Sequence, residues 1–305
     1  MKTLETPTTT LLTLGLLTFG LLAGGATLQA GETVDRTLPA ASDVEVEIEN
    51  IAGSVVVEVW DRSEVRVVAE LGDDVELLEI DAEADEIRIE VEIPDHSGRR
   101  RNWDIDSELQ VWVPAGASVG VETVSASIEV HGIGGAIDLE SVSGSIEADG
   151  SPDNADLATV SGNIDFRGSA SAVDAETVSG RVRLEGVSRN VDVSTVSGSV
   201  DVEATSIERG DCESWWGSSE FRGDVAAGAR LDCTSHSGNI ELKLPSSTAA
   251  SFEIETFAGD IRSDFGGEVR RTSRYAPGRE LYHSTGSDAR ISVETFSGNV
   301  YLIRD

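Results

Sequence analysis

Six aspartates recur at one position of a repeated motif in this chain, and an oxygen-rich column of this kind can hold cations. Each stands six residues before a turn glycine, and together they are Asp138, Asp156, Asp174, Asp192, Asp211 and Asp232. Calcium prefers clustered carboxylate oxygens, so stacked repeats would make this column a calcium-binding edge. The calcium-binding pattern Gly-Gly-x-Gly-x-Asp is absent, however, and a solvated polar edge without a bound ion is the alternative interpretation. We expect no other cofactor.

The two cysteines of the chain occupy equivalent positions in successive repeats. Cys212 and Cys233 each stand five residues before a turn glycine. Stacked repeats would bring their Cα atoms within reach of a disulfide, and export to an oxidising space favours the bond. We predict a Cys212–Cys233 disulfide, with two buried thiols acting as small apolar residues as the alternative.

Two adjacent tryptophans follow the first cysteine. Trp215 takes the position that Val196 fills one repeat earlier, which we interpret as an inward, core position. Trp216 replaces the serine of the turn, so we expect its indole to be exposed. An exposed indole can stack on a sugar ring, which makes Trp216 a candidate ligand-stacking residue.

Catalytic motifs do not emerge from the sequence. The four histidines give neither a Ser-His-Asp order nor a metal-ligand spacing. Carboxylates are so numerous that a glycosidase pair cannot be singled out. The rival to a non-enzymatic protein is a polysaccharide-active β-helix lyase or hydrolase, because β-solenoids host such enzymes. That rival needs basic residues to hold an acidic polymer, and the formal net charge of −33 has the wrong sign.

A repeat of 18 residues must position all of these side chains. Its turn motif begins at Thr123, Ser141, Thr159, Thr177 and Thr195, and reads Thr-Val-Ser-Gly-Asn-Ile in the third copy. A fixed period near 20 residues with β-branched residues on both sides of a glycine is typical of a solenoid. Two pairs of apolar columns lie nine residues apart, so each coil has two short strands. A left-handed hexapeptide helix is disfavoured because the column Ala136, Asn154, Ala172 and Asn190 interrupts a six-residue apolar period.

We therefore predict an all-β fold, a right-handed parallel β-solenoid with coils of roughly 18–21 residues and an irregular β-rich N-terminal end. The turn glycine should supply a backbone conformation that a side chain would hinder. These corner glycines are Gly144, Gly162, Gly180, Gly198, Gly217, Gly238, Gly259 and Gly298.

The first 30 residues have the composition of a signal peptide. A leucine-rich stretch leads to Leu28-Gln29-Ala30, a small-residue cleavage site before Gly31. The alternative is an uncleaved anchor, and no later segment is apolar for long enough to span a bilayer. The remaining 31–305 should form one solenoid domain, divided into irregular coils that cap the N-terminal end (31–113), regular coils (114–261), an inserted loop or hairpin (262–290) and a closing coil (291–305).

The chain is strongly acidic, with 56 Asp and Glu residues against 23 Lys and Arg residues. Such a surface repels phosphate backbones and anionic lipid, so we expect no nucleic-acid partner. It suits an exported protein that stays soluble in the periplasm or outside the cell.

Motifs along the whole mature chain are similar to those of one known family. They are Asn50-Ile51-Ala52-Gly53-Ser54-Val55, then Val111-Trp112-Val113-Pro114-Ala115-Gly116, then the repeated Thr-Val-Ser-Gly turns. In these the chain resembles the putative-adhesin family of β-strand-repeat proteins, domain of unknown function 4097. The resemblance implies a repeated β fold and brings no catalytic residues. We predict an exported, non-catalytic β-solenoid of the bacterial cell envelope, an adhesin-like binding or structural module whose partner is an envelope protein or a glycan.

Overall fold

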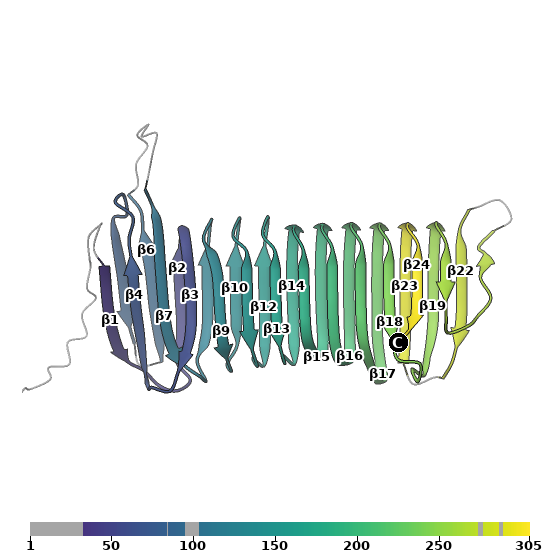
Figure 1. Ribbon diagram of the computed structural model, residues 1–305, viewed down its shortest axis with the longest axis horizontal. Coiled ribbons are helices and arrows are strands. Elements are labelled where there is room, and N and C mark those ends of the chain that lie inside the picture. The colour runs from purple at the N-terminus through teal and green to yellow at the C-terminus, as the bar shows by residue number, and fades with distance from the viewer. Residues whose placement is uncertain (1–32, 84, 95–103, 274–276, 287–288) are drawn as a thin grey trace, which may run out of the picture.

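The computed structural model describes residues 33–83, 85–94, 104–273, 277–286 and 289–305. The predicted signal peptide lies outside this range. The described residues form an all-β structure, a 24-stranded and mostly parallel sheet that curves nearly closed on itself. Figure 1 shows the strands side by side along the long axis of the molecule, in two layers.

One layer, ladder 1, contains ten strands of its own. They are β5 (Leu77–Ala82), β6 (Glu86–Glu92), β2 (Glu45–Asn50), β8 (Ser118–Thr123), β10 (Ile137–Ser141), β12 (Asn154–Thr159), β14 (Ala172–Ser179), β23 (Ala289–Ser297), β19 (Ala250–Ala258) and β22 (Arg279–Ser284), with the short β21 (Arg270–Arg271) beside β22.

The opposite layer, ladder 2, is built in the same way. Its strands are β1 (Thr33–Pro39), β4 (Glu64–Glu70), β7 (Asp106–Pro114), β3 (Ala52–Trp60), β9 (Ser127–Ile133), β11 (Ile146–Gly150), β13 (Ile164–Gly168), β18 (Ile240–Leu244), β24 (Val300–Arg304) and β20 (Ile261–Ser263). Three long strands, β15 (Val182–Ser197), β16 (Val200–Trp216) and β17 (Ser219–Ser237), bend at a corner and belong to both ladders.

The register stacks equivalent residues of the repeat on one another. Ile137 pairs with Ala155, Ala155 with Val173, and Val173 with Val191, always in parallel strands. Each step is the 18-residue spacing of the sequence repeat. Within the Thr123–Val200 block all pairings are parallel, as predicted. Residues at the same position of successive repeats therefore form a column along the molecule.

The core lies between the two ladders and consists of these columns. Ile164 and Phe166 of β13 and Leu157 of β12 are buried, and their columns continue in both directions. Each such side chain contributes about 1.5–3 kcal/mol relative to its exposed state. The alternation of buried and exposed residues along each strand follows from the two-residue period of β structure.

Several corners that follow ladder 1 strands are held by a buried hydroxyl. The Gly162 amide donates to Thr159 Oγ1 at 3.1 Å, and Thr159 Oγ1 donates to the Gly144 carbonyl of the preceding repeat, also at 3.1 Å. A Cβ atom on Gly162 would lie 1.9 Å from that carbonyl oxygen, and one on Gly198 would lie 1.7 Å from the Gly180 carbonyl oxygen. Gly162 and Gly198 are therefore required by the close approach of the neighbouring corner and not by a special backbone conformation, because neither has positive φ.

Antiparallel strands cover the N-terminal end of the sheet. β5 pairs with β6, β4 with β7 and β1 with β4, all antiparallel. These strands end the parallel ladders, and the edge strands described there, β1 and β5, are both paired antiparallel.

The C-terminal end departs from the order of the sequence. We expected 291–305 to close the stack, and this expectation is wrong. β23 lies between β17 and β19, and β24 lies between β18 and β20 (Figure 1). In its slot β23 places Ile291 between Leu231 and Phe252, so its apolar residues are matched on both sides. The other edge of β19 is covered by β22, an antiparallel strand of the inserted 262–290 segment.

Candidate binding groove

An exposed row of valines runs along the corner of ladder 1. It contains the valine that follows each buried Thr or Ser of the turn motif: Val124, Val142, Val160, Val178 and Val196, whose side chains are 38–48% exposed. Residues before and after a buried residue of a strand point outward, so a buried Thr195 requires an exposed Val196. The prediction that Trp215, the equivalent of Val196, packs in the core is therefore wrong, and Trp215 is 54% exposed.

Aromatic side chains continue this row toward the C-terminal end. Trp215, His236, Phe296 and Phe257 follow one another in adjacent strands. The ring centroids are 5.6 Å apart for Trp215 and His236, 5.1 Å for His236 and Phe296, and 4.9 Å for Phe296 and Phe257. The rings of the last two pairs are stacked and nearly parallel, with interplanar angles of 2° and 8°. We call the five valines and these four rings the apolar ridge.

A second row, two residues earlier in each strand, carries carboxylates. Its acidic members, which we call the glutamate ridge, are Glu49, Glu122, Glu140, Glu176, Glu213, Glu294 and Glu255. The residue between the two ridges is a Thr or Ser whose side chain is buried, so a groove runs between them. Its N-terminal part has a volume of about 750 Å³ and its C-terminal part about 530 Å³. Both parts are lined by Glu213 and Trp215, so they form one continuous groove.

The six predicted aspartates lie in register beside the glutamate ridge. Asp138 pairs with Asp156, and the column continues without interruption to Asp232. Partial burial, followed by the charge of a neighbouring aspartate, raises the pKa of Asp138, Asp174 and Asp192. In the glutamate ridge, partial burial and then nearby carboxylates raise the pKa of Glu49 and Glu140. The face therefore carries crowded negative charge at neutral pH.

On the outer face of ladder 2, acidic side chains form ion pairs with Arg and Lys residues. Arg167 lies 2.7 Å from Glu147, Arg183 lies 2.6 Å from Glu185, and Lys243 is paired with both Glu220 and Glu241. On ladder 1, from β8 to the end of β15, the described residues include no ion pair to the aspartate column or the glutamate ridge. Further along, Arg230 pairs with Asp232 and Arg290 with Glu253. The central part of the groove is thus acidic and uncompensated.

The family of the chain follows from a match over nearly the whole fold just described. A model of the Toastrack DUF4097 family matches residues 37–302. The chain belongs to this family. No curated protein matches the sequence.

Solved structures similar to this Toastrack chain share its fold at low sequence identity. A putative adhesin from Parabacteroides distasonis has 12% identity and a TM-score of 0.50, with 88% of this chain and 97% of that chain covered. A putative adhesin from Parabacteroides merdae has 13% identity and a TM-score of 0.50, with coverages of 71% and 91%. A putative lipid binding protein from Parabacteroides distasonis has 14% identity and a TM-score of 0.51, with coverages of 88% and 97%. At such identities the likeness shows the fold alone.

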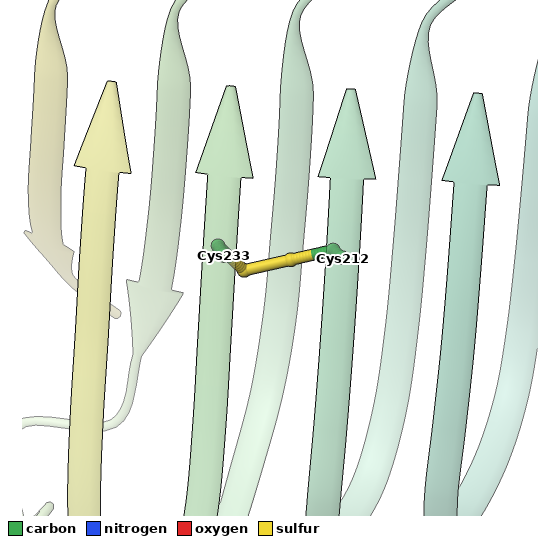
Figure 2. Close-up of a disulfide and its surroundings, with 2 residues drawn as sticks. All are labelled: Cys212 and Cys233. Atoms are coloured by element: carbon green, nitrogen blue, oxygen red, sulfur yellow. A yellow bond between two sulfur atoms is a disulfide. The ribbon is translucent and has the colours of Figure 1, made fainter. Parts of the chain in front are cut away.

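The two cysteines of the Toastrack chain meet across adjacent strands of ladder 1. Cys212 of β16 pairs in register with Cys233 of β17, with Cα atoms 4.6 Å apart. Figure 2 shows the bond between their sulfur atoms, which joins neighbouring repeats. Both residues are buried, in the column that Val193 occupies one repeat earlier.

The aspartate column is a line of carboxylates, in which each member has at most two aspartate neighbours. Among the described residues, the three carboxylates that converge closely enough to share a cation are Glu79, Glu90 and Glu92, at the capped N-terminal end. No such trio occurs within the column itself. Calcium binding along the column stays a prediction.

Trp216 lies at the turn, outside the residues that line the groove. Its side chain is 54% exposed and its ring centroid is 6.1 Å from that of Trp215. Exposure of Trp216 was expected, and its role in stacking on a ligand stays a prediction. No helix in the described part of the Toastrack chain is long and apolar enough to cross a membrane.

The groove itself was missed in the sequence. The sequence did contain a signal for the groove. Thr159 stands two residues after the buried Leu157 and points to the same side of the sheet, so Val160 must point outward. The apolar character of valine suggested the core instead. Strict alternation carried through the turn motif would have placed the whole apolar ridge on the surface.

Proposed function

We propose that this chain is an exported, non-catalytic binding module of the bacterial cell envelope, and that it binds an elongated partner along the groove. The exported part is a right-handed parallel β-solenoid with coils of roughly 18–21 residues, preceded by a signal peptide over 1–30. Its partner is an envelope protein or a glycan, met in the periplasm or at the cell surface.

The observation that carries this proposal is the exposed apolar ridge. Single exposed apolar residues are common on protein surfaces, but a contiguous row is rare and marks an interaction site. Here five valines and four aromatic rings follow one another in register. Repeat proteins use such extended surfaces for binding.

The test measures binding and turnover together. The mature chain is titrated with isolated envelope fractions and with polysaccharides, and both saturable binding and released product are followed. The double variant Val160→Ser/Val178→Ser should lose the saturable binding. Val269→Ser is the matched control, because Val269 is similarly exposed but does not line the groove.

Three results would contradict the proposal. They are no saturable binding by the wild-type chain, equal binding by the double variant, and release of product, which would favour the polysaccharide-active enzyme. Export is tested separately by mass spectrometry of the secreted protein, which should begin at Gly31.

A further inference from the structure

The two ridges of the groove offer two different chemistries at a fixed separation. Glu176 and Val178 lie two residues apart on β14, about 6.6 Å along the strand, and the same offset recurs at Glu140 and Val142, where the valine directly follows β10. A partner that follows the groove therefore meets apolar groups along one side and, along the other, a row of glutamates that is interrupted at Ala158, Ser194 and Thr234. Such a partner must itself be amphipathic along its length.

The negative charge of the groove favours a partner with positive charge. Between β8 and β15 the described residues provide no cation to the glutamate ridge or the aspartate column, whereas ladder 2 pairs its acids with Arg167, Arg183 and Lys243. Like charges stacked along a ladder are destabilising, so their retention on one face only is a local conflict of the kind that marks functional sites. A cationic partner relieves it. A second copy of this chain, with its own −33 charge, or an anionic lipid surface would increase the repulsion.

The aromatic part of the apolar ridge argues for side chains rather than sugar rings. His236 lies between Trp215 and Phe296, and Phe296 lies between His236 and Phe257. The faces of His236 and Phe296 are flanked by neighbouring rings, so the middle of the aromatic row presents ring edges. Sugars bind aromatic residues through the ring face, whereas ring edges pack against aliphatic and aromatic side chains.

The spacing of the ridge fits a helix better than an extended chain. Neighbouring strands are about 4.8 Å apart, close to the ~5.4 Å between helical turns and shorter than the ~6.6 Å between alternate residues of a strand. The nine positions from Val124 to Phe257 span about 38 Å, which a helix of about 25 residues covers.

We propose that the groove binds a basic amphipathic helix, which sets apolar side chains against the apolar ridge and Lys or Arg side chains against the glutamate ridge. This inference rests on the proposed function and names the chemistry of its partner. The long Lys and Arg side chains also cover apolar surface with their stems, so they suit a groove with one wall of each kind.

The probe is a synthetic 25-residue peptide of Leu and Lys in helical periodicity, titrated into the mature chain by calorimetry and circular dichroism. It should bind with a gain of helical signal and with weaker affinity at high salt. Glu140→Gln/Glu176→Gln and, separately, Trp215→Ser should each weaken binding about tenfold, which corresponds to ~1.4 kcal/mol. Glu129→Gln/Glu203→Gln removes the same charge from the outer face of ladder 2 and should leave binding unchanged. Thermal unfolding of each variant checks that it is folded.

The outcomes separate the inference from the function on which it rests. Equal binding of a scrambled peptide of the same composition, or equal effects of the two glutamine variants, would mean general charge attraction and would overturn the inference. If the peptide does not bind but a polysaccharide does, and Val160→Ser/Val178→Ser abolishes that binding, the inference fails and the proposed function stands. If the peptide, the polysaccharides and the envelope fractions all fail to bind, both fail.

Discussion

Replacing Asp174 by asparagine should stabilise this protein. Asp174 lies in register between Asp156 and Asp192, at the ~4.8 Å spacing of neighbouring strands. Two unit charges at this distance repel by ~0.9 kcal/mol in water. The dielectric of water gives a lower limit for this repulsion, because Asp174 is exposed to solvent but partly shielded by its neighbours. Removing both repulsive contacts should therefore raise the free energy of unfolding by about 1–2 kcal/mol at low ionic strength.

The same column sets the direction of the pH dependence. The pKa of Asp174 is raised above the ordinary value of 3.8 by partial burial and then by Asp192, Glu176 and Asp156. The folded chain therefore binds this proton more tightly than the unfolded chain, and the free energy of unfolding decreases as the pH rises through the folded-state pKa. Lowering the pH from 7 toward 4 should stabilise the wild-type protein, and the advantage of Asp174→Asn should disappear near pH 4.

Thermal unfolding followed by circular dichroism provides the assay. At pH 7 and about 10 mM salt, where the Debye length is ~30 Å, Asp174→Asn should raise Tm by about 2–8 °C. In 1 M salt the gain should shrink, because the Debye length falls to ~3 Å. The control is Asp165→Asn on ladder 2, whose carboxylate lies 3.7 Å from Arg167 and whose loss should be neutral or destabilising. A lower Tm for Asp174→Asn, or the same gain for Asp165→Asn, would refute the reasoning.

Three further outcomes are expected. Gly162→Ala should destabilise the fold by several kcal/mol or prevent folding, because its Cβ would meet a backbone oxygen, whereas the Cβ of Gly120→Ala has its nearest contact at 3.9 Å and should be tolerated in thermal unfolding. Replacing Cys212 and Cys233 together by serine should cost about 3 kcal/mol in denaturant unfolding, and free thiols in the oxidised wild-type protein would contradict the bond. Deletion of 289–305 should expose the β19 amides to hydrogen exchange, because β23 lies between β17 and β19; unchanged protection would show that its slot is dispensable.

At the capped N-terminal end, the local sequence pattern predicts the strands but not how they pair. Alternation in Glu86–Glu92 predicts a strand, and the structure contains β6 there. The pattern does not say that β6 pairs antiparallel with β5 on one side and parallel with β2 on the other. Parallel and antiparallel pairing both leave the same side chains of β6 buried. The direction of each pairing therefore depends on which strands the fold places next to β6.

The candidate groove was only half predictable. The columns of Asp138 and its equivalents follow from the repeat, and the structure stacks them in register. Trp215 was misplaced because apolar character suggested burial, while strand parity decides which side of the sheet a residue occupies. The absence of cations beside the described central part of the groove needs both faces to be compared, which only their placement in space allows.

Parallel stacking follows from the repeat alone, because a fixed 18-residue spacing with matched apolar columns leaves one register in which every inward side chain stays buried. The repeat also accounts for the corners, since Gly162 and its equivalents admit the neighbouring carbonyl that any side chain would displace. The position of β23 and β24 inside the stack, and not at its end, became apparent only from the arrangement of the strands in space. The free edges offered by successive repeats are nearly equivalent, so the selection among them depends on contacts between segments distant in sequence.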